Sequence, residues 1–152
     1  MIKLRNPGPD EVVALTDLCL RSKAVWGYDQ QFMEACRGEL TFAATDLCLR
    51  CIQVAETDGR VMGVVEVTAK GEEAELTKLF VEPTNLRAGV GRKLFEWAKA
   101  AAHTFGASVL TIDADPGAAN FYRRMGAADD GVVPSGSIPG RVLPRLVFRL
   151  RE

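Results

Sequence analysis

The chain has 152 residues, 47% of them apolar and 26% charged, which is the composition of an ordinary globular protein. This length predicts one domain, spanning residues 1–152, with a core of its own. The 19 basic and 20 acidic side chains leave no excess charge to attract nucleic acid or an anionic membrane, so neither is expected as a partner. Residues 1–7 lack the apolar stretch of a signal peptide, and no apolar run is long enough to cross a bilayer, which favours a cytoplasmic protein.

The four cysteines, Cys19, Cys36, Cys48 and Cys51, are expected to be buried free thiols rather than a metal site. Only Cys48 and Cys51 have the spacing of zinc ligands, and no second pair or histidine cluster completes such a site. The single histidine, His103, falls on the polar face of a predicted helix and is expected to be solvated. Since no cysteine has an evident histidine partner, covalent catalysis through a thiol is not expected.

The first part of the chain predicts one strand and two helices. Apolar and charged residues alternate over residues 2–6, as in a short strand. Asp10 is expected to cap a helix whose apolar positions recur near every 3.6 residues as far as Val25. Asp29 is expected to cap a second, shorter helix that ends around Gly38.

From about residue 49 the apolar pattern changes to a period of two, which predicts strands. Asp58-Gly59 is a strong hairpin signal, and the valine-rich residues 60–69 form the return strand. A second turn at residues 70–73 leads into a strand at 74–81. The sequence therefore predicts three consecutive antiparallel strands.

The second half alternates helices and strands. A helix is predicted over residues 90–105, followed by a strand at 108–114 that is parallel to strand 74–81 because a helix crosses between them. The remaining predicted elements are a helix at 116–125, a loop at 134–141 and a strand at 143–150. The order predicts an α/β protein with a mixed sheet and helices on both faces.

A glycine-rich loop, Arg87-Ala88-Gly89-Val90-Gly91-Arg92, leads into the helix at 90–105. Glycines let the backbone approach an anion, and the first turn of a helix offers unpaired N–H groups, so the loop predicts a phosphate or pyrophosphate site. A dinucleotide-binding fold is disfavoured, because the third glycine position is Leu94 and seven residues separate Val81 from Gly89, where that fold has a tight turn.

Two motifs in this order resemble the GNAT superfamily of acetyl-CoA-dependent N-acetyltransferases: Arg-x-Gly-x-Gly before a helix, then Ala118-x-x-Phe121-Tyr122-x-x-x-Gly126-Ala127. The resemblance implies a central, mostly antiparallel sheet with one splayed parallel pair, acetyl-CoA as co-substrate and no metal. The cofactor-binding residues it implies are Leu79, Phe80, Val81, Arg87, Ala88, Gly89, Val90, Gly91, Arg92, Ala118, Phe121 and Tyr122.

The sequence departs from the family pattern at two positions. The family's usual Gln or Arg would stand at position 86, which is Leu86 here, with Arg87 one place later. The second motif commonly opens with Asn, where this chain has Asp115. An acid beside an anionic cofactor is unfavourable, so Asp115 is expected to cap the helix that begins at Pro116.

The resemblance also implies catalytic roles. Tyr122 is the expected acid for the departing thiolate, and its alternative is a core tyrosine on the apolar face of its helix. Glu75 falls where the histone-acetyltransferase branch of the superfamily carries its catalytic glutamate, so it is the expected general base. Glu66 on the preceding strand is its rival, and both could instead be exposed strand charges.

The acceptor site of this superfamily is usually built by the first two helices and the last strands, which implies Trp26, Tyr28, Ser137 and Arg141 here. Aromatics with a nearby acid suit a cationic amine, whereas Arg141 suits an acceptor with a carboxylate. Packing at the helix junction and a flexible loop are the alternative reading. The predicted function is transfer of acetyl from acetyl-CoA to a small-molecule or peptide amine by direct attack. The alternative is a non-catalytic acyl-CoA-binding or sensing module, and the resemblance leaves a homodimer open.

Overall fold

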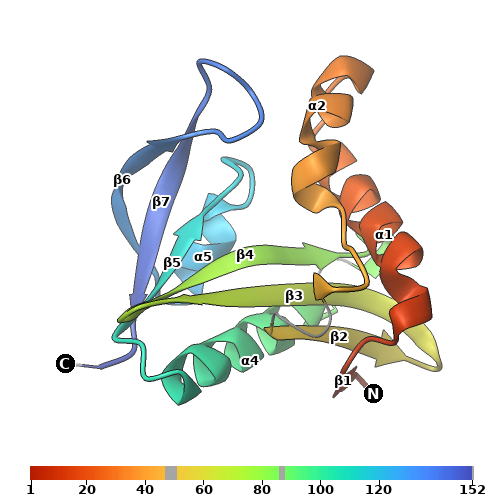
Figure 1. Cartoon of the computed structure of the whole chain (residues 1–152), viewed down its shortest axis with the longest axis horizontal. Coiled ribbons are helices and arrows are strands. Elements are labelled where there is room, and N and C mark those ends of the chain that lie inside the picture. Colours follow the sequence, from red (N-terminus) through yellow and green to blue (C-terminus); the bar gives the residue numbers. More distant parts are fainter. Residues whose placement is uncertain (47–50, 86–87, 152) are drawn as a thin grey trace.

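The computed structural model describes residues 1–46, 51–85 and 88–151. They form one seven-stranded sheet in the order β1-β2-β3-β4-β5-β7-β6, and Figure 1 shows the path of the chain. The strands are β1 (Lys3–Arg5), β2 (Cys51–Thr57), β3 (Arg60–Lys70), β4 (Glu73–Val81), β5 (Val109–Asp113), β6 (Ala128–Pro134) and β7 (Val142–Arg149). Only β4 and β5 pair in parallel, and the other neighbouring strands are antiparallel, as the sequence predicted.

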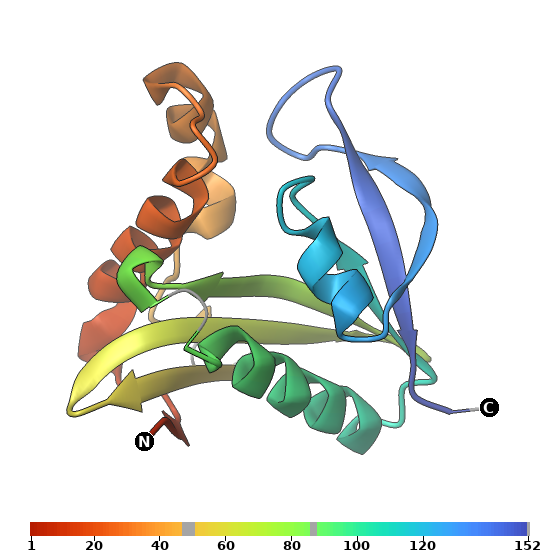
Figure 2. The ribbon, with the colours of Figure 1, turned by 180° about the vertical axis from the view of Figure 1, so that it is seen from behind.

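Helices cover both faces of the sheet. The helices α1 (Val12–Ala24) and α2 (Gln30–Leu40) lie on one face, and α4 (Val90–Thr104) lies along the other, as Figures 1 and 2 show from opposite sides. Two apolar clusters result: a larger one joins the sheet to α4 and the short helix α5 (Ala119–Arg124), and a smaller one joins it to α1 and α2. Short 3-10 turns precede α1 (Pro9–Glu11) and follow β4 (Pro83–Asn85).

Of the two predicted helix caps, the one at α2 is confirmed and the one at α1 is wrong. Asp29 caps α2 as predicted, since its Oδ1 accepts a hydrogen bond from Phe32 N at 2.8 Å. Asp10 does not cap α1, because it lies within the 3-10 turn. Glu11 forms the hydrogen bonds at this helix start instead. Its carboxylate accepts from Gly8 N at 2.7 Å and binds the Arg5 guanidinium through both oxygens at 2.8 Å.

Two elements near the C-terminus were predicted incorrectly. The helix expected at 116–125 is confined to Ala119–Arg124, because residues 115–118 form a turn closed by a hydrogen bond from Ala118 N to Asp115 O. The edge strand β6 was not predicted at all. Its Asp129-Asp130-Gly131 segment consists of poor strand formers, and nearly the whole strand is exposed.

A bulge divides β4 into two halves with opposite side-chain parity. Val67 of β3 is opposite Leu76, but the next residue, Glu66, is opposite Lys78, so Thr77 is an extra residue in the ladder. Before the bulge Ala74 and Leu76 face the α4 cluster; after it Leu79 and Val81 do. The bulge therefore turns Lys78 and Phe80 toward α1 and α2.

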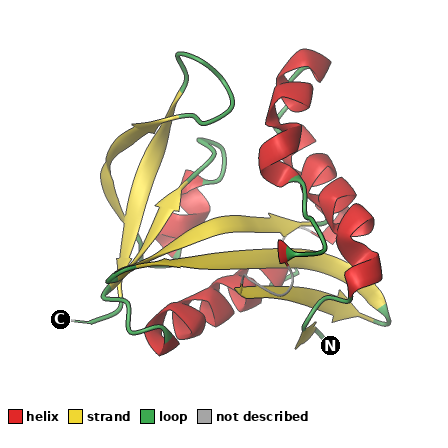
Figure 3. Cartoon of the chain, in the orientation of Figure 1, coloured by secondary structure: helices red, strands yellow, loops and turns green. Residues whose placement is uncertain are grey.

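The parallel pair separates halfway along β4. Pairing with β5 runs from Glu73↔Val109 to Leu76↔Ile112 and then ends, whereas pairing with β3 continues to Val81. Figure 3 shows β5, β6 and β7 turning away from β2, β3 and β4 beyond this point. The predicted splayed parallel pair is confirmed.

Several smaller expectations concern single residues. Cys19 and Cys36 are buried free thiols as predicted, Cys51 is a free thiol but only half-buried, and Cys48 lies outside the described residues. His103 is exposed on α4, also as predicted. Among the described residues, no helix is long and apolar enough to span a membrane, and no cluster of side chains has the makings of a metal site.

Candidate active site

A cleft of about 1100 Å³ opens where β4 and β5 separate. Its walls come from the end of α1, the second half of β4, the start of α4, the β5–α5 connection and the β6–β7 connection. The larger part of the sequence-predicted site gathers here. The predicted cofactor-binding residues that line the cleft are Leu79, Phe80, Val81, Gly89, Gly91, Arg92, Ala118, Phe121 and Tyr122.

The glycine loop forms one end of the cleft. Gly89 is the N-cap of α4 and has φ of +87°, a left-handed conformation that side chains disfavour. Gly91 packs closely on α5, since a Cβ there would lie 3.3 Å from Phe121 Cζ. The first turn of α4 therefore presents its backbone N–H groups to the cleft without intervening side chains, beside the exposed Arg92.

Two other predicted loop residues lie outside the cleft lining. Val90 is buried under the loop against the core, and Ala88 is exposed but does not line the cleft. Arg87, together with Leu86, lies outside the described residues.

The edge of β4 that faces β5 forms the floor of the cleft. Beyond Leu76 this edge has no strand partner among the described residues, although the opposite edge of β4 stays paired with β3. Backbone groups on an open edge can pair with an extended ligand as a further strand would. Leu79, Phe80 and Val81, which the resemblance implied as cofactor-binding residues, lie along this edge.

Tyr122 lies in the wall opposite, on α5. It is 6% exposed, and its ring packs against Phe95 at 5.7 Å and Phe121 at 5.1 Å between centroids. Burial raises the pKa of its phenol, which keeps the hydroxyl protonated. Tyr122 lines the cleft, and its hydroxyl has no hydrogen-bond partner within the described parts of the chain. A ligand in the cleft could supply that partner.

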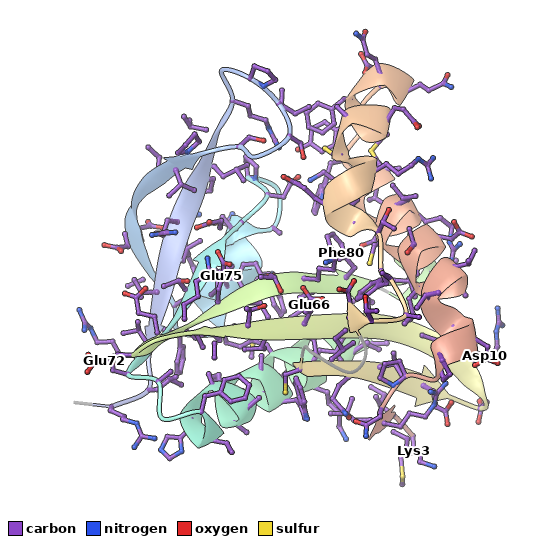
Figure 4. The ribbon with its side chains drawn as sticks, in the orientation of Figure 1. Lys3, Asp10, Glu66, Glu72, Glu75 and Phe80 are labelled. Atoms are coloured by element: carbon purple, nitrogen blue, oxygen red, sulfur yellow. The ribbon has the colours of Figure 1, made fainter. Side chains whose placement is uncertain are left out.

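The two candidate bases, Glu75 and Glu66, lie on the face of the sheet that carries α1 and α2, and Figure 4 labels both. Glu75 lines the cleft with a partly exposed carboxylate, whose Oε2 is 3.1 Å from Lys70 Nζ. Glu66 is fully buried, and its Oε1 accepts hydrogen bonds from Thr77 Oγ1 at 2.6 Å and Lys78 Nζ at 3.2 Å. Protonation of Glu66 would break an ion pair, so its position favours a structural role.

This buried ion pair sits directly at the β4 bulge. Lys78 is only 6% exposed and its Nζ lies 4.9 Å from the centre of the Phe42 ring. Sequence analysis identified Glu66 but missed Thr77 and Lys78. A lysine inside a strand otherwise bounded by apolar residues was the available signal.

At the opposite end of the cleft, the predicted acceptor residues Tyr28 and Arg141 meet. Arg141 Nη2 donates to Tyr28 Oη at 2.6 Å, and Tyr28 Oη donates to Asp115 Oδ2 at 2.8 Å. Burial, and next the bond to Asp115, raise the pKa of Tyr28 to about 12. Neither Tyr28 nor Arg141 lines the cleft itself, but Asp115 does.

The other two predicted acceptor residues differ in position. Trp26 lines the cleft, and its ring covers Gly117 so closely that an added Cβ there would lie 2.8 Å from Trp26 Cδ2. Ser137 does not line the cleft, and its backbone N–H bonds Ser135 Oγ within the β6–β7 connection. The structure therefore brings Trp26, Tyr28 and Arg141 to this end and leaves Ser137 behind them.

Asp115 does not cap α5 as predicted, because that helix begins at Ala119 with Ala118 at its N-cap. Its Oδ1 accepts from Gly117 N at 3.0 Å, which stabilises the turn before α5. Its Oδ2 meets Tyr28, Lys23 Nζ at 3.4 Å and Arg141 Nη2 at 3.5 Å. Sequence analysis missed Lys23, which reads as an ordinary helix lysine.

A split parallel pair beside a glycine-capped helix start is the arrangement that the resemblance implied, and comparison with known proteins agrees. The family described as "Acetyltransferase (GNAT) domain" matches residues 49–126, just over half of the chain. The chain therefore belongs to the GNAT family of acetyltransferases. No curated protein matches it significantly.

Solved structures share the whole fold at low sequence identity. A GCN5-related N-acetyltransferase from Rhodopseudomonas palustris is 22% identical with a TM-score of 0.79, over 97% of this chain and 95% of that one. The PaiA N-acetyltransferase from Thermoplasma acidophilum, solved with coenzyme A, is 15% identical with a TM-score of 0.78, over 98% and 99%. YncA from Salmonella typhimurium, a putative acetyltransferase solved with acetyl-CoA, is 18% identical with a TM-score of 0.72, over 100% and 95%.

Proposed function

We propose that the protein is an N-acetyltransferase that moves the acetyl group of acetyl-CoA directly to an amine. The observation that carries this proposal is the end of β4–β5 pairing at Leu76↔Ile112, which opens the cleft through the sheet. The glycine loop begins α4 on one face, while Glu75 and the α1–α2 side lie on the other. Donor and acceptor can therefore approach the same point from opposite faces.

The donor is proposed to bind along the open edge of β4. Its pyrophosphate would lie at the N-terminus of α4, where N–H groups and the helix dipole favour negative charge. Its pantetheine arm would pair with the backbone of residues 79–81, which positions the thioester near the fork. Complexes of two similar folds with CoA and acetyl-CoA support this choice of co-substrate.

Acetyl transfer then needs a deprotonated amine and a proton for the departing thiolate. The amine nitrogen attacks the thioester carbonyl, the C–S bond breaks, and the thiolate is released. Tyr122 is proposed to donate a hydrogen bond and then its proton to that sulfur. Burial disfavours a phenolate, so the proton that the attacking nitrogen loses as the amide forms is proposed to restore the Tyr122 hydroxyl, and CoA leaves as the neutral thiol.

Glu75 is proposed to accept the proton from the ammonium form of the acceptor, directly or through water. It is the carboxylate on the acceptor face of β4 that is both partly exposed and on the cleft wall. Attack through an acyl-enzyme has little support, because Cys19 and Cys36 are buried and the lone His103 is exposed on α4.

The proposal is tested with purified protein, acetyl-CoA and a panel of amines, with released thiol and product mass as the readouts. CoA at a hundred times its Kd should stabilise the fold by about 2.7 kcal/mol. For a chain of this length that corresponds to a rise in melting temperature of about 5–10 °C. A raised melting temperature without transfer to any amine would favour the acyl-CoA-binding module instead. No effect of CoA on melting would refute both.

A further inference from the structure

Four side chains from four separate segments meet at the α1–α2 end of the cleft. They are Lys23 at the end of α1, Tyr28 in the α1–α2 connection, Asp115 after β5, and Arg141 in the β6–β7 connection. Asp115 Oδ2 is the common partner, at 2.8 Å from Tyr28 Oη, 3.4 Å from Lys23 Nζ and 3.5 Å from Arg141 Nη2. We call this group the basic cluster.

The basic cluster has more positive than negative charge. Lys23 and Arg141 share the single carboxylate of Asp115, so one positive charge is left unbalanced. Glu39 also lines the cleft, but within the described ranges it forms no ion pair with either cation. Hydrogen-bond donors are in surplus as well: the Arg141 bonds to described residues all come from Nη2, which leaves the Nε and Nη1 donors for another partner.

The cations are held in place before any ligand arrives. Tyr28 stacks on Phe32 with ring centroids 3.9 Å apart and planes 15° apart. The Arg141 guanidinium lies 4.9 Å from the Phe32 ring centre, and the Lys23 ammonium 5.9 Å from it. The Lys23 and Arg141 side chains are only 11% and 18% exposed. Charges so poorly solvated attract an anion more strongly than charges on an open surface would.

The cluster occupies the acceptor's side of the proposed reaction. Lys23 at the end of α1 and Asp115 after β5 line the cleft, with Tyr28 and Arg141 behind them, whereas the glycine loop begins α4 on the other face of the sheet. An acceptor whose amine reaches the fork at Leu76 and Ile112 would therefore have the rest of the molecule beside the cluster.

We propose that Lys23 and Arg141 bind a carboxylate on the acceptor, so that the substrate is an amino carboxylate such as a free amino acid. This inference rests on the proposed acetyltransferase function. The single unbalanced charge matches a monoanion, and a planar carboxylate suits guanidinium donors. The acceptor carboxylate would meet the Lys23 ammonium on the cleft wall, with the Arg141 guanidinium behind it adding positive charge and Asp115 retained as their support.

The test compares matched acceptors: each amino acid of a panel, its carboxamide, and the amine that lacks the carboxyl group. kcat/KM is measured by thiol release at saturating acetyl-CoA and expressed per unprotonated amine. The amino acids should exceed both neutral analogues by about ten- to a hundredfold, the range of one or two charge-assisted hydrogen bonds. The preference over the amine that lacks the carboxyl group would run against amine basicity, because that amine is the more basic and therefore the better nucleophile.

The variants Lys23→Met and Arg141→Gln separate binding from structure. Both should raise KM for the amino acid by tenfold or more and leave kcat/KM for the carboxamide within about twofold, whereas structural damage would lower both rates together. Arg141→Lys should retain part of the preference. Arg37→Gln, on exposed α2 and paired with Glu34, is the control and should change neither rate.

Three results would overturn the inference. Equal rates for acid and carboxamide in the parent protein would remove the carboxylate site while leaving the acetyltransferase function intact. An undiminished preference in both Lys23→Met and Arg141→Gln would assign the carboxylate to other residues. Failure to acetylate any amine would refute the proposed function, and the inference would fall with it.

Discussion

Replacing Glu66 by glutamine would leave the Lys78 ammonium buried under the cleft without the carboxylate that its nitrogen contacts at 3.2 Å. Glu66 is 0% and Lys78 6% exposed, so water cannot replace the lost charge. Removing one member of such a pair costs about 3–5 kcal/mol, against a total stability of about 5–15 kcal/mol for a typical domain. At about 2–4 °C per kcal/mol for a chain of this length, Glu66→Gln should lower the melting temperature by about 6–20 °C.

The matched control is Glu96→Gln on the surface of α4. Glu96 Oε2 lies 3.1 Å from Lys99 Nζ, nearly the distance in the buried pair, but these side chains are 54% and 22% exposed. Such a pair contributes about 0.3–0.5 kcal/mol, so this variant should melt within about 2 °C of the parent. The difference between the two variants then measures the effect of burial rather than of ion-pair geometry.

A double-mutant cycle completes the test by equilibrium urea unfolding. Glu66→Met with Lys78→Met removes both charges, and Thr77 Oγ1 keeps the Glu66 backbone oxygen as a partner at 3.1 Å. The double variant should therefore be more stable than either Glu66→Met or Lys78→Met alone. The reasoning is refuted if Glu66→Gln loses less than about 1 kcal/mol, the scale of a surface pair, or if the losses of the two single variants simply add.

Three further predictions concern chemistry and pH. Tyr122→Phe should lower kcat at least tenfold with unchanged CoA affinity, measured by steady-state kinetics and calorimetry; lost stability with normal turnover would identify a core tyrosine instead. Glu75→Gln should lower the rate most near neutral pH, where an alkylammonium acceptor of pKa about 10.4 is protonated, and high pH should restore it; an unchanged pH–rate profile would exclude Glu75 as base. The pKa of Glu11 is lowered to about 2, first by its bond to Arg5, so its contribution to stability is complete above its ordinary value of 4.5 and lost as pH falls toward 2. Glu11→Gln should lose about 1 kcal/mol at pH 7 and show a shallower decline over that acid range; an equal decline would contradict the assignment.

Local sequence patterns were sufficient to predict most strands of the sheet. Alternation on both sides of Asp58-Gly59 predicted the β2–β3 hairpin, because a pleated strand with buried faces must repeat every two residues. β6 escaped prediction because it is an exposed edge strand paired only with β7, so no burial pattern marks it. The bulge at Thr77 did leave a signal, since the apolar residues of β4 step by three between Leu76 and Leu79 instead of by two.

The two ends of the cleft differed in how far they could be predicted. The donor end is built from one continuous loop and helix, so a local motif contains its geometry. The acceptor end joins segments up to 113 positions apart, such as Tyr28 and Arg141, and no local pattern records such a meeting. Lys23 shows the difficulty: as a helix lysine it predicts exposure, but tertiary contacts leave 11% of its side chain exposed.

Thr77, the extra residue in β4, also limits where the chain can lose or gain residues during evolution. If Thr77 were deleted, the two halves of the strand would share one parity, and Lys78 and Phe80 would exchange faces with Leu79 and Val81. The lysine would enter the apolar layer against α4, and the open edge of β4 would lose its alignment with β5. The β3–β4 turn consists of only Gly71 and Glu72, so a deletion there would disturb the pairing of Lys70 with Glu73 as well. Natural length variation in relatives of this chain should therefore avoid position 77 and collect in longer connections, such as residues 135–141 between β6 and β7.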